Sequence, residues 1–183
     1  MSTVKQTKPP DAQGIRSRGS RYFLSFLPIA LLLLAGCEPE EEFPDEPYIE
    51  FEDFIKINND STGLIILSFT DGNGDIGLGP GDTLDPYVGK YYYNFFLYIF
   101  SKKDGVFDSV KTHFPFHGRI PRLENVAEGE SIQGEIEMEI DIYSMELFIP
   151  EDTLAFDIYI VDRALNQSNT VRTPEIILNR FSP

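Results

Sequence analysis

The segment Asp71-Gly72-Asn73-Gly74-Asp75 places three oxygen-bearing side chains at alternate positions, with a glycine between neighbours. Carboxylate and amide oxygens are the ligands that Ca²⁺ prefers, and one ion takes six to eight of them. The glycines let the backbone curl, so that alternate side chains can converge on one point. The spacing therefore predicts a candidate Ca²⁺ site at Asp71, Asn73 and Asp75.

Three side chains do not fill the shell of a Ca²⁺ ion, so other oxygens must complete it. The EF-hand calcium loop also uses its first, third and fifth positions, but it has glycine at the sixth and glutamate at the twelfth. This chain has Ile76 and Asp82 at those two positions, and Asp82 is therefore a fourth candidate ligand. The alternative interpretation is a glycine-rich turn whose polar side chains cap backbone amides.

A second polar segment, Asp162–Asn169, follows an apolar run and offers Asp162 as a fifth candidate ligand. In an immunoglobulin-like sandwich, the loop between the second and third strands and the loop between the last two emerge at the same end. Asp162 and the asparagines of its segment can then share one site with Asp71. The alternative is that Arg163 pairs with a loop carboxylate while the asparagines cap turns.

The same glycines also match the spacing of a dinucleotide-binding loop, as Gly72-x-Gly74-x-x-Gly77. That loop must be followed directly by a helix, which places the phosphates at its N-terminus. The sequence continues with Leu-Gly-Pro-Gly, which cannot propagate a helix. The match is therefore accidental.

No other residues form the pattern of an active site. Pro115 between His113 and His117 rules out the helical histidine pair of zinc proteases. A Gly-x-Ser-x-Gly nucleophile elbow is absent from the sequence, and the acids are too numerous to single out a glycosidase pair. We therefore predict no catalytic residues, no cofactor-binding residues and a non-enzymatic protein.

Positioning these loops requires a scaffold, and most of the chain has the period-two pattern of β-strands. The clearest case is Ile132–Ile142, where isoleucine and methionine alternate with acidic or amide side chains. Further strands are predicted at Tyr48–Ile57, Thr62–Thr70, Tyr91–Ser101, Val106–Lys111, Leu154–Val161 and Thr170–Leu178.

No stretch shows an apolar stripe at helical spacing, and Lys102-Lys103-Asp104-Gly105 is typical of a hairpin turn. The pattern predicts an all-β fold over residues 48–183, an immunoglobulin-like or fibronectin-III-like β-sandwich of about seven strands. The connection from Asp71 to Lys90 is long for a hairpin, which makes it a functional candidate. One face of the aromatic Tyr91–Ser101 segment can meet a ligand or partner.

The N-terminal 36 residues predict a secretory signal. Five basic residues and one acid precede an apolar run of about 14 residues, Tyr22–Ala35, which is shorter than a membrane-spanning helix. The run closes on Leu34, Ala35, Gly36 and Cys37, which resemble the bacterial lipobox. The resemblance implies cleavage before Cys37 and attachment of lipid to it. Cys37 is the only cysteine, so an intramolecular disulfide is excluded.

Residues 37–47 follow as an acidic, flexible tether that begins Cys37-Glu-Pro-Glu-Glu-Glu. Without residues 1–36, the chain keeps 10 basic and 29 acidic residues, a net charge of −19. Such a charge opposes nucleic acid and anionic lipid as partners and favours divalent cations or basic proteins.

Four segments together resemble a group of small lipoproteins of the Bacteroidota outer membrane, a group without an established activity. They are Leu34–Cys37, Phe69–Leu78, Arg119–Pro121 and Asp162–Asn169. The group commonly has Asp-Gly-Asp-Gly-Asp-Ile-Gly in the loop, and Asn73 departs from it by one neutral oxygen. The resemblance implies a lipid-anchored protein of the outer membrane, with the acidic tether as a signal for export to the cell surface; the alternative is the periplasmic face.

The sequence therefore predicts a lipid-anchored cell-surface β-sandwich module that binds a partner protein or an extracellular ligand such as a glycan. The alternative is a structural accessory subunit of an outer-membrane complex, and a carboxylate-based glycan hydrolase is a third hypothesis. The membrane is contacted through the N-terminal lipid, and Ca²⁺ is the candidate cofactor.

Overall fold

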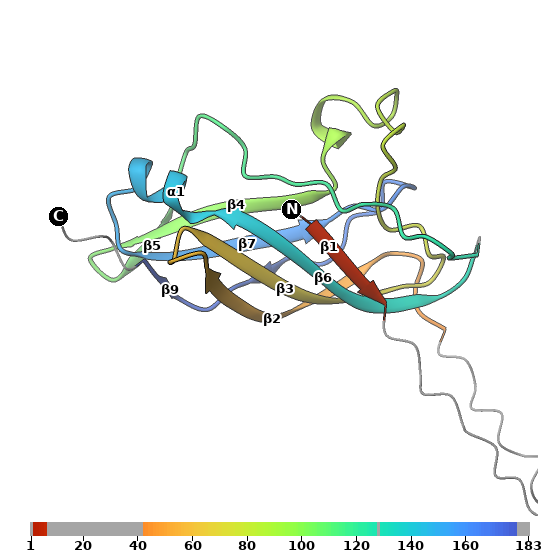
Figure 1. Ribbon diagram of the computed structural model, residues 1–183, viewed down its shortest axis with the longest axis horizontal. Helices are drawn as coiled ribbons and strands as arrows, with labels where there is room; N and C mark the ends of the chain where they lie inside the picture. Colours follow the sequence, from red (N-terminus) through yellow and green to blue (C-terminus); the bar gives the residue numbers. More distant parts are fainter. Residues whose placement is uncertain (1, 7–41, 128, 179–183) are drawn as a thin grey trace, which may run out of the picture. The chain divides into compact units, whose positions relative to one another are not determined.

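The computed structural model of this chain describes residues 2–6, 42–127 and 129–178. Residues 2–6 and 43–178 belong to one compact unit, in which two antiparallel β-sheets pack face to face (Figure 1). The all-β sandwich is thereby confirmed, while its immunoglobulin or fibronectin-III type stays a prediction. The expected lipobox at Leu34–Cys37 lies outside the described residues. Among those residues, no helix has the length and apolar character needed to cross a membrane.

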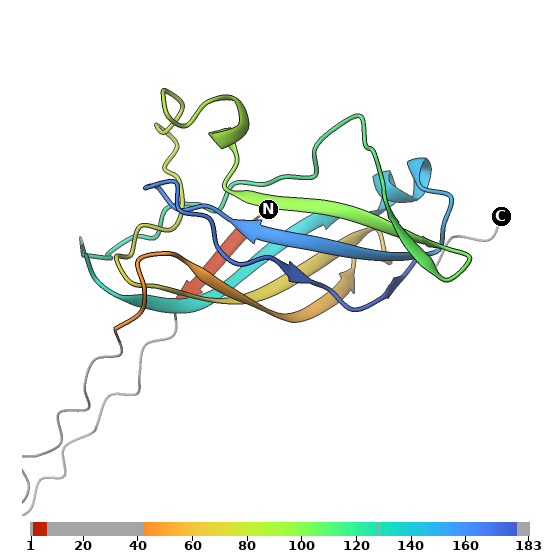
Figure 2. The same ribbon diagram turned by 180° about the vertical axis from the view of Figure 1, so that it is seen from behind.

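The first sheet has the strand order β1-β6-β3-β2. Its strands are β1 (Ser2–Gln6), β2 (Tyr48–Ile57), β3 (Thr62–Asp71) and β6 (Ile132–Asp141). The second sheet has the order β5-β4-β7-β8, with β9 also paired to β7 (Figure 2). Its strands are β4 (Phe95–Lys103), β5 (Val106–Ser109), β7 (Thr153–Ile160), β8 (Val171–Arg172) and β9 (Ile176–Ile177).

The core lies between the two sheets, because each strand turns its alternate apolar side chains inward. Ile65 and Leu67 of β3 and Ile136 of β6 are fully buried from one side, and Phe156 and Ile158 of β7 from the other. The acidic side chains that alternate with them along β6 lie on the outer face. The predicted alternation of β6 is therefore confirmed.

The hairpin predicted at residues 102–105 is confirmed. Lys103 pairs with Val106, and the two residues between them, Asp104 and Gly105, both have positive φ. Positive φ at both central positions is the geometry that a two-residue turn needs to match the twist of its strands.

Two strand predictions need correction. The aromatic segment Tyr91–Ser101 is divided, because Gly89–Tyr92 forms a short 3₁₀ helix and β4 begins only at Phe95. Aromatic residues favour strands through packing rather than through the backbone itself, so composition did not reveal this turn. The segment Thr170–Leu178 is also divided, into β8 and β9, around Pro174, which has no backbone N–H to donate.

Within the described part of the chain, an α-helix occurs where the sequence shows no helical pattern. Helix α1 (Ile142–Phe148) follows β6 directly, so Ile142 is helical rather than the end of a strand. Asp141 caps it, because its carboxylate accepts a hydrogen bond from the amide of Ser144 at 3.0 Å. Ile142 and Met145 bury one side of the helix in the core.

Candidate metal centre

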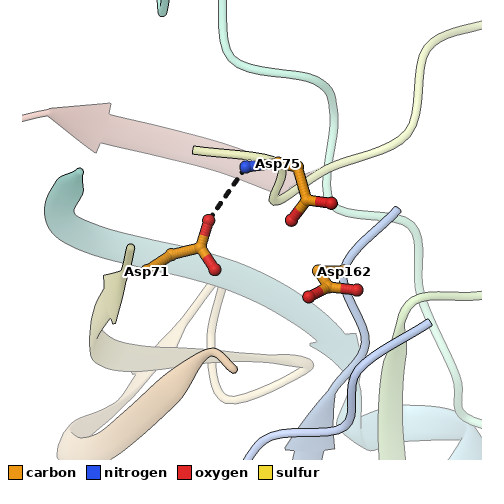
Figure 3. A group of neighbouring side chains, drawn as sticks. All are labelled: Asp71, Asp75 and Asp162. Atoms are coloured by element: carbon orange, nitrogen blue, oxygen red, sulfur yellow. Dashed lines mark hydrogen bonds between the residues drawn. The ribbon is translucent and has the colours of Figure 1, made fainter. Parts of the chain in front are cut away.

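Three carboxylates from two separate loops meet at one end of the sandwich. Asp71 is the last residue of β3, Asp75 lies four residues later, and Asp162 follows β7. One oxygen from each carboxylate lies within 4.8 Å of the other two, and Figure 3 shows the three groups converging. We call these residues the carboxylate cluster, and their loops the Asp71 loop (residues 71–82) and the Asp162 loop (residues 161–169).

The two loops are joined by hydrogen bonds from the Asp162 loop to Asp75. The amide of Arg163 donates to the carbonyl oxygen of Asp75 at 3.2 Å, and the amide of Ala164 donates to its Oδ2 at 3.0 Å. The expectation that the two loops lie at the same end therefore holds in the structure.

Backbone amides hold each carboxylate of the cluster in place. The amide of Asp75 donates to Oδ2 of Asp71 at 2.8 Å, as Figure 3 shows. Asn166 donates twice to Asp162, from its amide nitrogen at 2.7 Å and from its side chain at 2.9 Å. These bonds use one oxygen of Asp71, one of Asp75 and both of Asp162.

Two carboxylate oxygens of the cluster are buried and have no hydrogen-bond donor among the residues that the structure describes. They are Oδ1 of Asp71 and Oδ1 of Asp75. Asp71 and Asp162 are both fully buried, and Asp75 is half-buried. A buried carboxylate oxygen without a partner is costly, so a proton, a cation or a buried water molecule would stabilise each of these atoms.

Burial also raises the pKa of all three carboxyl groups. The pKa of Asp71 rises from 3.8 to about 6, mainly because burial disfavours its charged form and further because Asp75 and Asp162 lie nearby. Burial is the largest cause of the raised pKa of Asp75 and of Asp162 as well. The ionised carboxylates are therefore destabilised in this site, and a bound cation would offset the repulsion between them.

Arg163 binds the curled backbone of the Asp71 loop. Its guanidinium donates to the carbonyl oxygens of Ile76 at 3.2 Å, Gly77 at 3.1 Å and Gly74 at 3.4 Å. Its charge lowers the pKa of Asp75 in part, against the larger effect of burial. In the alternative interpretation Arg163 pairs with a loop carboxylate; in the structure its guanidinium donates to these three carbonyl oxygens and acts on Asp75 through its charge.

The two other predicted ligands cap turns in this structure. Oδ1 of Asn73 accepts a hydrogen bond from the amide of Asp75 at 3.2 Å, which helps to curl the loop. Oδ2 of Asp82 accepts one from the amide of Gly79 at 2.7 Å, within the next turn. The structure does not bring Asp82 into the carboxylate cluster, because the residues from Gly79 to Asp82 fold back on themselves.

The end of the predicted tether contacts the same loop. The amide of Gly72 donates to the carbonyl oxygen of Pro44 at 2.8 Å, and the amide of Phe43 donates to Oγ of Ser131 at 3.3 Å. A Cβ atom on Gly72 would lie 2.2 Å from the carbonyl oxygen of Phe43, so this approach requires glycine. We call Phe43 and Pro44 the tether root.

Arg119 and Ile120 also shape the site, although the sequence analysis assigned no role to either residue. The guanidinium of Arg119 donates to the carbonyl oxygens of Gly79 at 3.0 Å and Asp82 at 3.2 Å. The carbonyl oxygen of Ile120 accepts from the amide of Leu78 at 2.9 Å. Bonds to carbonyls depend on backbone direction, so residue types alone do not reveal them; the only signal was that Arg119–Pro121 formed part of the resemblance.

The cluster meets the geometric demand of Ca²⁺. Two oxygens that bind one Ca²⁺ at 2.3–2.6 Å lie at most about 5 Å apart, a limit that the 4.8 Å spread satisfies. All the ligand atoms that the cluster offers to a metal are hard carboxylate oxygens, which suit Ca²⁺ rather than a softer metal. Bidentate binding, loop carbonyls or water would complete the shell.

The outer face of β4 holds a separate aromatic group. Phe96 stacks on Tyr159 with ring centroids 4.7 Å apart, and the hydroxyl oxygens of Tyr98 and Tyr159 lie 3.4 Å apart. His117 packs on Tyr98, and its Nδ1 accepts a hydrogen bond from the amide of Leu97 at 3.2 Å. These contacts give His117 a structural role.

Comparison of the chain with protein-family models, curated proteins and solved structures found no match.

Proposed function

We propose that this chain is a non-enzymatic, lipid-anchored module of the cell surface that binds a partner protein or extracellular ligand and contains a Ca²⁺ centre. The observation that carries the Ca²⁺ centre is the pair of buried, unpartnered oxygens, Oδ1 of Asp71 and Oδ1 of Asp75. They lie beside a third buried carboxylate, that of Asp162.

A proton, a cation or a buried water molecule can satisfy such oxygens, and the pH decides between the proton and the cation. The pKa of Asp71, raised to about 6, means that protons occupy the cluster only in acid. Near neutral pH the cluster ionises, and three carboxylates within 4.8 Å repel one another. Ca²⁺ is the hard dication that extracellular modules bind at such sites, with a Kd of about 0.1–1 mM.

The place of the cluster supports a link between the ion and the anchor. The tether root contacts Gly72, the residue after Asp71, and the predicted lipidation site at Cys37 lies six residues before Phe43. An ion that stiffens the Asp71 loop would thereby stiffen the point at which the module joins its tether.

Thermal unfolding with Ca²⁺ and with EDTA tests the ion centre. A ligand at 100 times its Kd stabilises the folded state by about 2.7 kcal/mol, which is a rise of about 5–10 °C in Tm for a domain of this size. Asp75→Asn should abolish this rise, because it removes a charge while keeping the acceptor for Ala164. Asp82→Asn is the matched control and should keep the rise. Identical melting curves in Ca²⁺ and EDTA would refute the centre.

Anchoring and partner binding are tested separately. Cys37→Ser should block lipid attachment and move the protein from the detergent phase to the aqueous phase. A Cys37→Ser chain that still enters the detergent phase and is still cleaved after residue 36 would refute the anchor. The unmodified protein, captured from detergent-solubilised outer membranes, should bring a partner with it in Ca²⁺, and the Asp75→Asn variant should bring less. Equal capture by both proteins would show that partner binding does not depend on the ion.

A further inference from the structure

We infer that the mature chain takes up an extended strand of a partner protein along the outer edge of β6, with basic side chains facing the glutamates of that strand. The inference rests on the proposed removal of residues 1–36. The observation behind it is that a segment of those residues, Ser2–Gln6, already occupies this edge as β1 (Figure 1).

Strand β1 shows what the edge accepts. It runs antiparallel to β6, with Ser2 opposite Met138 and Gln6 opposite Gly134. β6 uses its other side for β3, in a continuous register from Ile132 to Asp141. Five residues of β1 therefore cover only the middle of a ten-residue strand.

Removal of residues 1–36 would leave this edge open. The other edge strand of the sheet, β2, has a register shift between Phe51 and Asp53, and such a bulge discourages further pairing. No shift interrupts the pairing of β6 with β3. Since a long, regular edge strand is a template for another chain, β6 rather than β2 is the edge suited to strand addition.

The side chains of β6 select the occupant. Ile136 and Met138 are buried, whereas Glu135, Glu137 and Glu139 follow the outer face. In the register of β1, Val4 lies opposite Ile136 and Lys5 lies opposite Glu135. The fitting strand thus has an apolar residue opposite Ile136 and a basic residue opposite Glu135.

A second copy of β6 is a poor occupant of the same edge. Two such strands side by side would bring two rows of glutamates together, and like charges across a strand pair are destabilising. The net charge of −19 on the mature chain adds to that repulsion. The charge on β6 thus favours a basic strand from another protein.

Hydrogen exchange on the mature protein purified from membranes tests the edge. Its intact mass first shows whether the chain begins at Cys37; a chain that retains residues 1–36 refutes the proposed maturation and this inference with it. A synthetic peptide of residues 1–7 is the probe. At about ten times its Kd, the peptide should slow exchange about tenfold at the β6 amides that point away from β3. Amides that β6 donates to β3 should not change.

Two altered peptides complete the experiment. Val4→Pro removes a backbone donor and Lys5→Glu reverses the charge opposite Glu135, so both should protect the edge less than the natural peptide. If the chain is correctly cleaved but the natural peptide does not slow exchange at the edge amides, strand addition is contradicted. That result would not contradict the proposed lipid anchor. Equal protection by the Lys5→Glu peptide would contradict the inference that the partner strand is basic. Edge protection that grows with protein concentration, without peptide, would indicate a second copy instead.

Discussion

The amide of Gly72 donates a hydrogen bond of 2.8 Å to the carbonyl oxygen of Pro44, so the tether root is held by the residue that follows Asp71. Asp71 contributes a buried, unpartnered oxygen to the carboxylate cluster. Because the same short stretch of backbone holds the tether root and the cluster, an ion bound at the cluster would restrain both.

The first prediction is that Ca²⁺ slows hydrogen exchange at the Gly72 amide relative to EDTA. This bond opens when the Asp71 loop or the tether root moves, and the ion would oppose the motion of the loop. The amide of Val110, which donates to the carbonyl oxygen of Ile99 at 2.9 Å outside the cluster and its loops, is the internal control and should not respond. Equal exchange at Gly72 in Ca²⁺ and EDTA would contradict the coupling.

Gly72→Ala should destabilise the domain by about 1–3 kcal/mol, the usual cost of forcing extra atoms into a packed site. Its Cβ would lie 2.2 Å from the carbonyl oxygen of Phe43 and 2.7 Å from that of Pro44, so the tether root must move. Gly81→Ala is the matched control, since its Cβ would meet no atom within 4 Å. Urea unfolding measures both, and equal midpoints for the two variants would contradict the prediction.

Without Ca²⁺, stability should fall as the pH rises from about 4 to about 6. The pKa of Asp71 is about 6 in the folded state against the usual 3.8, so in this window the folded chain binds a proton that the unfolded chain has lost. Stability therefore decreases with pH until the folded group has also ionised. Asp75 and Asp162 have raised pKa values and act with the same sign.

With Ca²⁺ present, the dependence of stability on pH should differ, because the ion binds only ionised carboxylates. The gain in Tm from Ca²⁺ should grow above pH 6 and vanish near pH 4. Asp71→Asn should flatten the metal-free profile between those values. A metal-free profile of Asp71→Asn that matches the natural chain would show that another group is responsible.

The strands were the most predictable part of the fold, for a physical reason. In β6 a buried apolar face and a wet acidic face alternate over ten residues, which leaves one register possible. Helix α1 has only seven residues, too few to show a clear period. The one feature of the sequence that indicated this helix was Asp141, a residue type that favours the N-cap position.

The site was predictable where it depends on short-range spacing or on topology. Asp71 and Asp75 meet because glycines curl the loop, and Asp162 joins them because both loops lie at one end of the sandwich. Asp82 was wrongly placed, since its own turn satisfies its Oδ2 through Gly79. The fork from Arg163 to loop carbonyls depends on the directions of three peptide groups, which only the folded backbone defines.

Replacing Glu40, Glu41 and Glu42 with Ala should keep the lipid anchor and retain the protein on the periplasmic face. The acidic run that follows Cys37 is the proposed signal for display, whereas lipid attachment depends on Leu34–Cys37. Digestion of whole cells with added protease measures exposure, and partition into detergent measures lipidation. Unchanged cleavage by protease in whole cells would contradict the role of the acidic run as a signal for surface display.

Replacing Arg163 should separate its hydrogen bonds from its charge. Arg163→Met leaves the carbonyl oxygens of Ile76 and Gly77 without their donor and should lower metal-free stability by about 2 kcal/mol. It also removes a positive charge near Asp75, so Ca²⁺ should bind more tightly. Arg163→Lys keeps the charge but loses the fork, so it should be destabilised without any gain in affinity. Calcium titration by calorimetry measures both variants, and equal affinities would show that the charge of Arg163 does not act on the ion.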